Sequence, residues 1–361
     1  MKKLIIKGMQ ARYFSEKIVE WYDLNKRNLP WRHTKDPYKI WLSEIILQQT
    51  RINQGLPYYK KLVSEFPTVN ELASAPEKKV LRLWQGLGYY SRARNMHACA
   101  KEVVNHFNAR FPKTSEELKR LPGIGEYTAA AIASISFNEQ VAVVDGNVFR
   151  VLSRIFGVDT PINSPEGKEQ FTTLANKLIG KGSPAIHNQA VMEFGALHCK
   201  PKNPLCTTCV FQTYCMANKH GLQSLLPIKI PKTKSRNRYL YYFVLLRNGS
   251  IMMNHRNGKD IWQGLYDFYL IEKNRFSVPE KLINDDPFLK KLMPTASSMS
   301  TSKRYTHILS HQKIQSKFTV LQLSKKPESV SGSLRFYSIK KVKELPKPAL
   351  ISRFLHDFRL L

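Results

Sequence analysis

Acidic side chains are scarce in this 361-residue sequence. Asp and Glu total 27 against 57 Lys and Arg, which leaves a formal net charge of +30 at pH 7. A field of this sign attracts polyanions, so it favours nucleic acid or an acidic membrane surface as a partner. Charge bears on partners and not on fold, and a basic surface that is merely solvated is the alternative interpretation.

Long apolar runs are also lacking. No run approaches the ~20 residues that a membrane-spanning helix needs, and residues 1–7 lack the apolar core of a signal peptide. We therefore expect a cytoplasmic protein, associated with the nucleoid if the source is bacterial, that acts as a monomer with no membrane partner. In a reducing compartment, cysteines are more often metal ligands or free thiols than disulfides.

The chain is long enough for two domains. Its first two-thirds show helical periodicity, as in residues 41–52, where Trp41, Ile45 and Leu47 recur on a helical rhythm. Residues 226–238 combine two prolines with several Lys and Arg, which is typical of a linker. We predict an all-helical domain over residues 1–225, this basic linker, and a smaller α+β domain over residues 239–361.

The α+β prediction depends on strand signals after the linker. Residues 239–246 and 251–254 are rich in β-forming types and flank Asn248-Gly249, which indicates a hairpin. Residues 305–308 and 318–323 favour further strands. Pro348 stands at the first turn of a predicted C-terminal helix.

Cysteine is rare, and four of the five copies lie together. Cys199, Cys206, Cys209 and Cys215 have the spacing C-x6-C-x2-C-x5-C, and four thiolates in one short segment can surround an iron–sulfur cluster or zinc. The spacing fits poorly with the paired C-x2-C knuckles of zinc ribbons, but residue types alone do not separate the two metals. Four unrelated thiols are the alternative, and Cys99 is typical of a buried cysteine.

A glycine hairpin lies at Leu121-Pro122-Gly123-Ile124-Gly125. Gly123 and Gly125 allow a tight turn and a close approach to another surface. A helix beginning near Glu126 would offer unpaired N–H groups to one phosphate. A lone G-x-G is equally typical of a plain helix–helix turn. Together with the cysteines and the basic charge, however, it is similar to the helix-hairpin-helix of DNA repair glycosylases.

The whole chain resembles the MutY-type adenine glycosylases of the endonuclease III superfamily. The matching segments follow the family order: Leu29-Pro30-Trp31-Arg32, residues 41–50, residues 86–95, residues 121–128, residues 144–150 and the four cysteines. The resemblance implies a helical helix-hairpin-helix glycosylase domain with a [4Fe–4S] cluster loop, followed by a Nudix-like domain. It also implies hydrolytic removal of adenine opposite 8-oxoguanine or guanine in double-stranded DNA, a step of base excision repair.

Hydrolysis of a purine glycosidic bond needs a proton for the base and stabilisation of an oxocarbenium-like sugar, which suits two carboxyl groups in different environments. Glu44 lies in an apolar segment where burial would favour its protonated form, so we predict that it protonates N7 of adenine; by resemblance it also activates the water. We predict that Asp145, held ionised at a helix N-terminus, faces C1′ electrostatically or through a transient covalent bond, and that Asn147 orients it. A solvent-facing Glu and a capping Asp are the ordinary alternatives.

Tyr127 separates two branches of the superfamily. Relatives that also cleave the strand carry a Lys two residues after the hairpin, whose amine attacks C1′ to form a Schiff base. A phenol cannot form an imine, so Tyr127 predicts a monofunctional glycosylase, and we expect it to shape the sugar pocket. The rival hypotheses are a pyrimidine glycosylase–lyase, opposed by Tyr127, and a non-catalytic DNA-binding module, opposed by the presence of both Glu44 and Asp145.

Further residues are candidates for contact with DNA. Gln49 and Tyr89 match the family's wedge positions, which fill the stack when the base is extruded, whereas Tyr90 is typical of a core residue. Arg32 and Gln189 are candidates for recognising the edges of the extruded adenine. A phosphate contact is the alternative for Arg32.

In the C-terminal domain, Ser310 matches the serine of the family's Phe-Ser-His loop, which recognises 8-oxoguanine. Here Leu309 precedes it in place of the usual Phe. A loop hydroxyl bonded to the backbone is the alternative for Ser310. The Glu-rich Nudix box is missing from the sequence, so we do not expect magnesium-dependent pyrophosphate cleavage.

Overall fold

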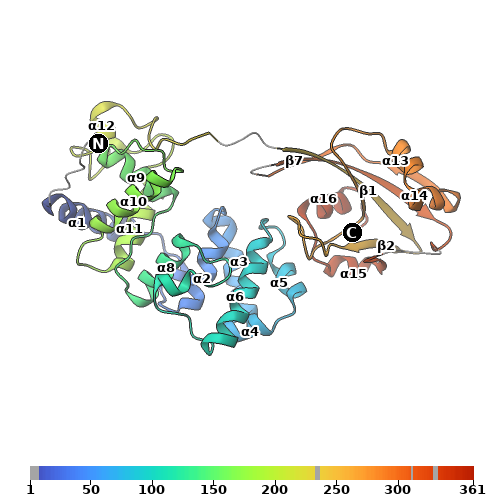
Figure 1. The fold of residues 1–361 in the computed structure, drawn as a ribbon, viewed down its shortest axis with the longest axis horizontal. Coiled ribbons are helices and arrows are strands. Elements are labelled where there is room, and N and C mark those ends of the chain that lie inside the picture. The colour runs from blue at the N-terminus through green and yellow to red at the C-terminus, as the bar shows by residue number, and fades with distance from the viewer. Residues whose placement is uncertain (1–7, 232–235, 310–311, 328–331) are drawn as a thin grey trace. The chain divides into compact units, whose positions relative to one another are not determined.

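The computed structural model describes residues 8–231, 236–309, 312–327 and 332–361. Two compact units divide the chain: a helical unit of Met1–Ala73 and Ala98–Lys232, and a mixed unit of Ser74–His97 and Thr233–Leu361. The predicted fold class, a helical region followed by a smaller α+β region, is confirmed (Figure 1). The predicted domain boundaries stay a prediction, and no pattern in the sequence indicated that Ser74–His97 groups with the C-terminal residues. In the described part of the chain, no helix is long and apolar enough to cross a membrane.

Helices make up the helical unit. They are α1 (Gly8–Asn25), α2 (Pro37–Leu47), α3 (Ile52–Glu65), α4 (Val69–Ser74), α7 (Ser115–Leu118), α8 (Glu126–Phe137), α9 (Gly146–Phe156), α10 (Pro165–Leu178), α11 (Pro184–Leu197) and α12 (Met216–His220), with 3-10 turns at Pro30–Arg32 and Cys206–Thr208. Helix α6 (Ser91–Phe107) belongs partly to this unit and partly to the mixed unit, which also contains α5 (Glu77–Trp84).

Helix α9 illustrates how the sequence determines this unit. Asp145 caps its first turn, and Gly157 ends it in the left-handed region with φ 67°. Its apolar residues recur on one face, so Val151 and Leu152 are buried in a core that also receives Ile18 of α1 and residues from α10 and α11. Figure 1 shows α9, α10 and α11 gathered beside one another.

The helical stretch expected over residues 41–52 is interrupted in the structure. Helix α2 ends at Leu47 and α3 begins at Ile52. Between them Gln49 takes φ 55°, a left-handed conformation that costs a side-chain-bearing residue free energy and stops a right-handed helix. Ile52 follows Ile45 by seven residues, which is a helical spacing, so the expected helix was extended across the four polar residues 48–51 that separate α2 from α3.

The mixed unit is built on one eight-stranded sheet. Its strands are β1 (Arg236–Arg247), β2 (Ser250–His255), β3 (Tyr266–Asp267), β4 (Tyr269–Lys273), β5 (Ala296–Thr301), β6 (Tyr305–Ile308), β7 (Gln312–Leu323) and β8 (Leu334–Ser338). The path is β3-β2-β1-β7-β5, with β4 paired to β1, β6 to β7 and β8 to β2. The helices are α13 (Pro279–Asp285), α14 (Pro287–Leu292), α15 (Ile339–Glu344) and α16 (Ala349–Asp357), with a 3-10 turn at Met293–Thr295.

The predicted hairpin and terminal helix are confirmed. Asn248 and Gly249 have φ 46° and 66°, the two positive values that a tight hairpin turn needs. Strand β1 then runs parallel to β7 from the Arg236–Gln312 pair to the Leu246–Gln322 pair. Strand β7 begins six residues before its predicted start at 318. Its first half alternates buried with more exposed residues, but two of the three buried residues, Gln312 and Ser316, are polar, so the apolar signal is weak.

Close approach of α9 and α11 yields a first prediction. A Cβ atom on Gly195 of α11 would lie 2.6 Å from Cβ and 3.1 Å from Cα of Asn147 in α9. We expect Gly195→Ala to lower the free energy of unfolding by about 1–3 kcal/mol, because a packed helix pair must separate. Denaturant titration measures this change. Gly182→Ala is the control, since a Cβ there meets no atom within 4 Å, and equal effects of both substitutions would contradict the prediction.

Candidate active site and cysteine cluster

Glu44 lies on α2 with only 8% of its surface exposed, as its apolar neighbours predicted. The hydroxyl of Tyr127, in the first turn of α8, donates a hydrogen bond to Glu44 Oε2 at 2.6 Å. Burial raises the pKa of Glu44 to about 7; the Tyr127 hydrogen bond lowers it and the charge of Asp145 raises it further. The carboxyl group is therefore close to half protonated at neutral pH, which is the range that suits a general acid.

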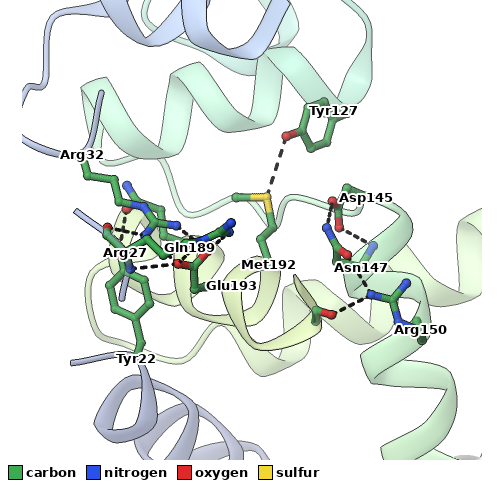
Figure 2. Close-up of polar contacts among 11 residues, drawn as sticks. Tyr22, Arg27, Arg32, Tyr127, Asp145, Asn147, Arg150, Gln189, Met192 and Glu193 are labelled. Atoms are coloured by element: carbon green, nitrogen blue, oxygen red, sulfur yellow. Dashed lines mark hydrogen bonds and ion pairs between the residues drawn. The ribbon is translucent and has the colours of Figure 1, made fainter. Parts of the chain in front are cut away.

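Tyr127 is itself fixed from a second side. Its hydroxyl lies 3.8 Å from the Met192 sulfur of α11 (Figure 2). Burial and the neighbouring Glu44 raise the pKa of the phenol well above its usual value, so Tyr127 stays protonated and acts as a donor. Helices α2, α8 and α11 thus meet at this hydroxyl.

Asp145 is held by three donors at the start of α9. Its Oδ1 accepts from the backbone N–H groups of Asn147 and Val148, each at 2.8 Å, and its Oδ2 accepts from Asn147 Nδ2 at 2.8 Å (Figure 2). The expected helix N-terminus is present, but burial outweighs these donors and raises the pKa of Asp145 above its ordinary value. The expectation that this N-terminus would favour ionisation omitted that opposing effect.

Arg150 continues the network, and sequence reasoning missed it. Its Nη2 donates to Asn147 Oδ1 at 2.8 Å and to the Gly195 carbonyl at 2.7 Å, and its Nε donates to the Cys199 carbonyl at 2.8 Å. A single guanidinium therefore joins the orienting Asn147 to the first cysteine. The segment that matches the family ends on Arg150, which was the available signal.

Arg32 is engaged by a buried acid. Its Nη1 and Nη2 donate to the two carboxylate oxygens of Glu193 at 2.9 and 2.8 Å, and Arg27 Nε also donates to Glu193 at 2.8 Å (Figure 2). Burial alone would raise the pKa of Glu193, but the hydrogen bonds from Arg27 and Arg32 lower it to about 2. The predicted base reader Gln189 accepts from the Tyr22 hydroxyl at 2.7 Å. Sequence reasoning missed Glu193, although a lone acid in the apolar α11 was a signal.

The other predicted DNA-contacting residues lie in turns. Tyr89, in the mixed unit, takes φ 47°, so like Gln49 it occupies the left-handed region. Gly123 has φ 77°, whereas Gly125 is extended and caps α8. Ser310 lies outside the described residues. The roles assigned to these residues stay predictions.

The four clustered cysteines lie in the segment between the end of α11 and the start of α12. Cys199 and Cys215 are buried, and Cys206 and Cys209 are partly exposed. Burial, together with the smaller effect of the three other cysteines, raises the pKa of Cys209 to about 12, so all three interact electrostatically with Cys209. Within the ranges that the structure describes, no group of three or more His, Cys, Asp or Glu residues has the geometry to hold a single metal ion.

The surroundings of the cysteines suit negatively charged sulfur ligands. Arg154 Nη1 lies 3.5 Å from Cys199 Sγ, and the backbone N–H of Phe211 donates to Cys209 Sγ at 3.4 Å. Such donors stabilise negative charge on sulfur. A cubane of iron and sulfide holds its four thiolates farther apart than one ion does, so a site without single-ion geometry is compatible with it.

The Glu44–Tyr127 pair yields a prediction about pH. Tyr127→Phe removes a hydrogen bond that lowers the pKa of Glu44, so that pKa should rise above about 7 in a carbon-13 NMR titration of the carboxyl groups. Because the native pKa exceeds the ordinary value of 4.5, the contribution of Glu44 to stability is full below pH 4.5 and is lost as the pH rises through 7. Tyr22→Phe, which removes a bond to Gln189, should leave the Glu44 midpoint unchanged. An unchanged midpoint in Tyr127→Phe would contradict this account.

Comparisons with known proteins identify the family of the chain. Residues 42–179 match the model of the HhH-GPD superfamily base excision DNA repair proteins, and residues 241–357 match that of the NUDIX domain. The chain is 34% identical over 261 residues to the adenine DNA glycosylase of Buchnera aphidicola from Schizaphis graminum, covering 72% of this chain and 75% of that protein. It is 41% identical over 226 residues to the rat adenine DNA glycosylase, covering 59% of this chain but 44% of that longer protein.

Two solved structures share the fold of the helical part. A thermostable thymine-DNA glycosylase aligns with TM-score 0.55 and 28% identity over 58% of this chain and 97% of that chain. An endonuclease III trapped as a covalent intermediate with DNA aligns with TM-score 0.51 and 21% identity, over 60% of this chain and 100% of that chain. The resemblance inferred from the sequence is confirmed. This chain belongs to the adenine DNA glycosylase family of HhH-GPD base excision DNA repair proteins.

Proposed function

We propose that this chain hydrolyses the glycosidic bond of adenine opposite 8-oxoguanine or guanine in duplex DNA, as a monomer and without strand cleavage. The observation that carries the proposal is a phenol, at the position where strand-cleaving relatives have an amine, bonded to a buried carboxyl group of pKa about 7. An acid of this pKa protonates a leaving base, and a phenol gives no Schiff base. We place the activity in the cytoplasm, with the DNA.

The first chemical step is departure of the base. Glu44 donates its proton to N7 of adenine as the bond between C1′ and N9 breaks. The electron pair of that bond passes to adenine. Asp145, oriented by Asn147, stabilises the positive charge that develops at C1′. The backbone N–H groups of α9 bond Oδ1 of Asp145 and the Asn147 side chain bonds Oδ2, so the carboxylate needs little reorganisation.

The second step is addition of water. Glu44, now ionised, takes one proton from water while the oxygen bonds to C1′, which restores the acid and leaves an abasic sugar. Adenine must leave the stack first, and we propose Gln49 and Tyr89 as the wedge residues that occupy the gap. Arg32 and Gln189 are the proposed readers of adenine, with Ser310 contacting 8-oxoguanine.

We further propose that Cys199, Cys206, Cys209 and Cys215 hold a [4Fe–4S] cluster. Bound there, the cluster ties a basic segment into a fixed loop. Lys200, Lys202 and Lys219 lie beside the cysteines in sequence, and a fixed loop would present such cations to DNA phosphates. The donors around Cys199 and Cys209 support this proposal.

A single-turnover assay tests the activity. The substrates are duplexes with A opposite 8-oxoguanine, A opposite T, and a damaged pyrimidine, each analysed with and without alkali. We expect alkali-dependent cleavage of the A strand in the first duplex alone. Asp145→Asn should slow this reaction at least about a hundredfold, whereas the exposed Asp159→Asn should not change it. Alkali-free cleavage at the pyrimidine lesion would favour the rival glycosylase–lyase function.

Metal analysis tests the cofactor. Anaerobically purified protein should contain about four iron and four sulfide per chain. Cys209→Ala should lose most of this iron, while Cys99→Ala, which changes a buried cysteine outside the group, should keep it. One zinc per chain without sulfide would refute the iron–sulfur proposal.

A further inference from the structure

The turn between α5 and α6, residues 86–90, is held by contacts within the mixed unit; we name it the wedge loop. Gly86, Gly88 and Tyr89 have φ 106°, 72° and 47°. The Trp84 indole donates to the Gly88 carbonyl at 3.0 Å, and Arg92 Nη2 donates to the same carbonyl at 3.2 Å. Tyr89 is 36% exposed, whereas Tyr90 is 3% exposed. The loop therefore presents one tyrosine and buries the next.

The side chains of Tyr90 and Gln85 both bond to the main chain of Lys347. This residue lies between α15 and α16, in residues 345–348, which we name the C-terminal segment. The Tyr90 hydroxyl donates to the Lys347 carbonyl at 3.0 Å, and the Lys347 backbone N–H donates to Gln85 Oε1 at 3.1 Å. Gln85 Nε2 also donates to Ser352 Oγ of α16 at 3.1 Å. Both main-chain groups of Lys347 are thus bonded to side chains at the two ends of the wedge loop: Gln85 precedes the loop, and Tyr90 is its last residue.

The gripped segment is itself fixed. The Lys347 side chain is 2% exposed, and its ammonium donates to the carbonyls of Val342 and Leu345 at the end of α15. The neighbouring Pro346 carbonyl accepts from the Tyr266 N–H of β3 at 2.9 Å. Burying an ammonium costs free energy unless hydrogen bonds compensate it, so these bonds hold the segment in one conformation.

A second set of contacts joins the same parts of the chain. Arg94 Nη1 donates to the Gln263 carbonyl at 2.8 Å. At the adjacent Gly264, with φ 81°, a Cβ would lie 2.9 Å from Leu81 Cδ1 of α5. The helices on both sides of the wedge loop are therefore packed on the mixed unit's own turns.

We propose that the C-terminal segment positions the wedge loop, with Gln85 and Tyr90 as positioning residues that act through Tyr89. A tyrosine keeps a left-handed backbone conformation only where its surroundings restrain the backbone. The hydrogen bonds of Gln85 and Tyr90 to Lys347 supply that restraint for Tyr89. The loop that enters the DNA and the unit proposed to recognise 8-oxoguanine then move as one body. This inference rests on the proposed function, in which Tyr89 occupies the gap left by adenine.

A double-mutant cycle tests the coupling. Tyr90→Phe keeps the ring and removes the hydroxyl bonded to Lys347, and Tyr89→Ala removes the wedge. At saturating enzyme, we expect Tyr90→Phe to slow adenine release from the 8-oxoguanine duplex about three- to tenfold, and to have no further effect when Tyr89 is already Ala. Gln85→Leu should behave as Tyr90→Phe does. Equal effects of Tyr90→Phe with and without Tyr89 would overturn the proposal, as would no effect of either Tyr90→Phe or Gln85→Leu.

Tyr241→Phe is the matched control. The Tyr241 hydroxyl accepts from the Ser277 N–H at 2.7 Å, so the substitution removes one partly buried bond between a tyrosine and the main chain of the same unit. The Tyr241→Phe substitution should lower the melting temperature as Tyr90→Phe does, but it should leave the rate of adenine release unchanged. An equal loss of rate in Tyr241→Phe would reduce the role of Tyr90 to stability and overturn the proposal.

A second readout separates this inference from the proposed function. The fluorescence of 2-aminopurine placed opposite 8-oxoguanine rises when the base unstacks, whether or not a bond is cut. If the wild-type chain unstacks the base but releases no adenine, the proposed hydrolysis fails while the cycle is still measured in fluorescence. If adenine is released but Tyr90→Phe leaves both readouts unchanged, the positioning role alone fails.

Discussion

Removal of the Glu44 carboxyl group from water is the constraint on which the rest of the site depends. Burial between α2 and α8 raises its pKa to about 7, and the single hydroxyl of Tyr127 moderates that rise. A carboxyl group in water would be ionised at neutral pH and could not protonate a purine. The three helices that meet at the Tyr127 hydroxyl therefore create the acid, and the residue type alone does not.

The second carboxyl group depends on a different balance. Desolvation also raises the pKa of Asp145, yet this carboxyl group has three donors where Glu44 has the Tyr127 hydroxyl. Asn147 and Arg150 extend those donors to the Cys199 carbonyl, so the cysteine loop and the carboxylate share one hydrogen-bonded network. Two acids about a hundred residues apart in sequence thus acquire separate environments, which is what acid-assisted departure of a base needs.

The mixed unit also depends on contacts between residues that are far apart in sequence. Residues of Ser74–His97 lie in the helical part of the sequence but group with the C-terminal residues. Tyr90 was predicted to be a core residue, and it is buried, but its partner is the main chain of Lys347. Local periodicity cannot identify a partner that lies 257 residues away.

The sequence by itself determined the residue types and their local order. A phenol stands at position 127, four cysteines share one segment, and Asn248-Gly249 forms a turn, because each depends only on neighbours in the chain. Helix and strand types followed from periodicity for the same reason, except at Gln49, whose left-handed backbone ends a helix that the spacing of Ile45 and Ile52 had extended.

Only the tertiary structure decided the electrostatics. The pKa of Asp145 is raised by burial among surrounding residues. Arg32 pairs with Glu193, and Tyr90 bonds to Lys347, and both contacts join segments that are far apart in sequence. Burial and hydrogen bonding set a group's charge, and both are properties of the space around a side chain. The sequence names the groups that can react, and the packing of distant segments sets their charge and orientation.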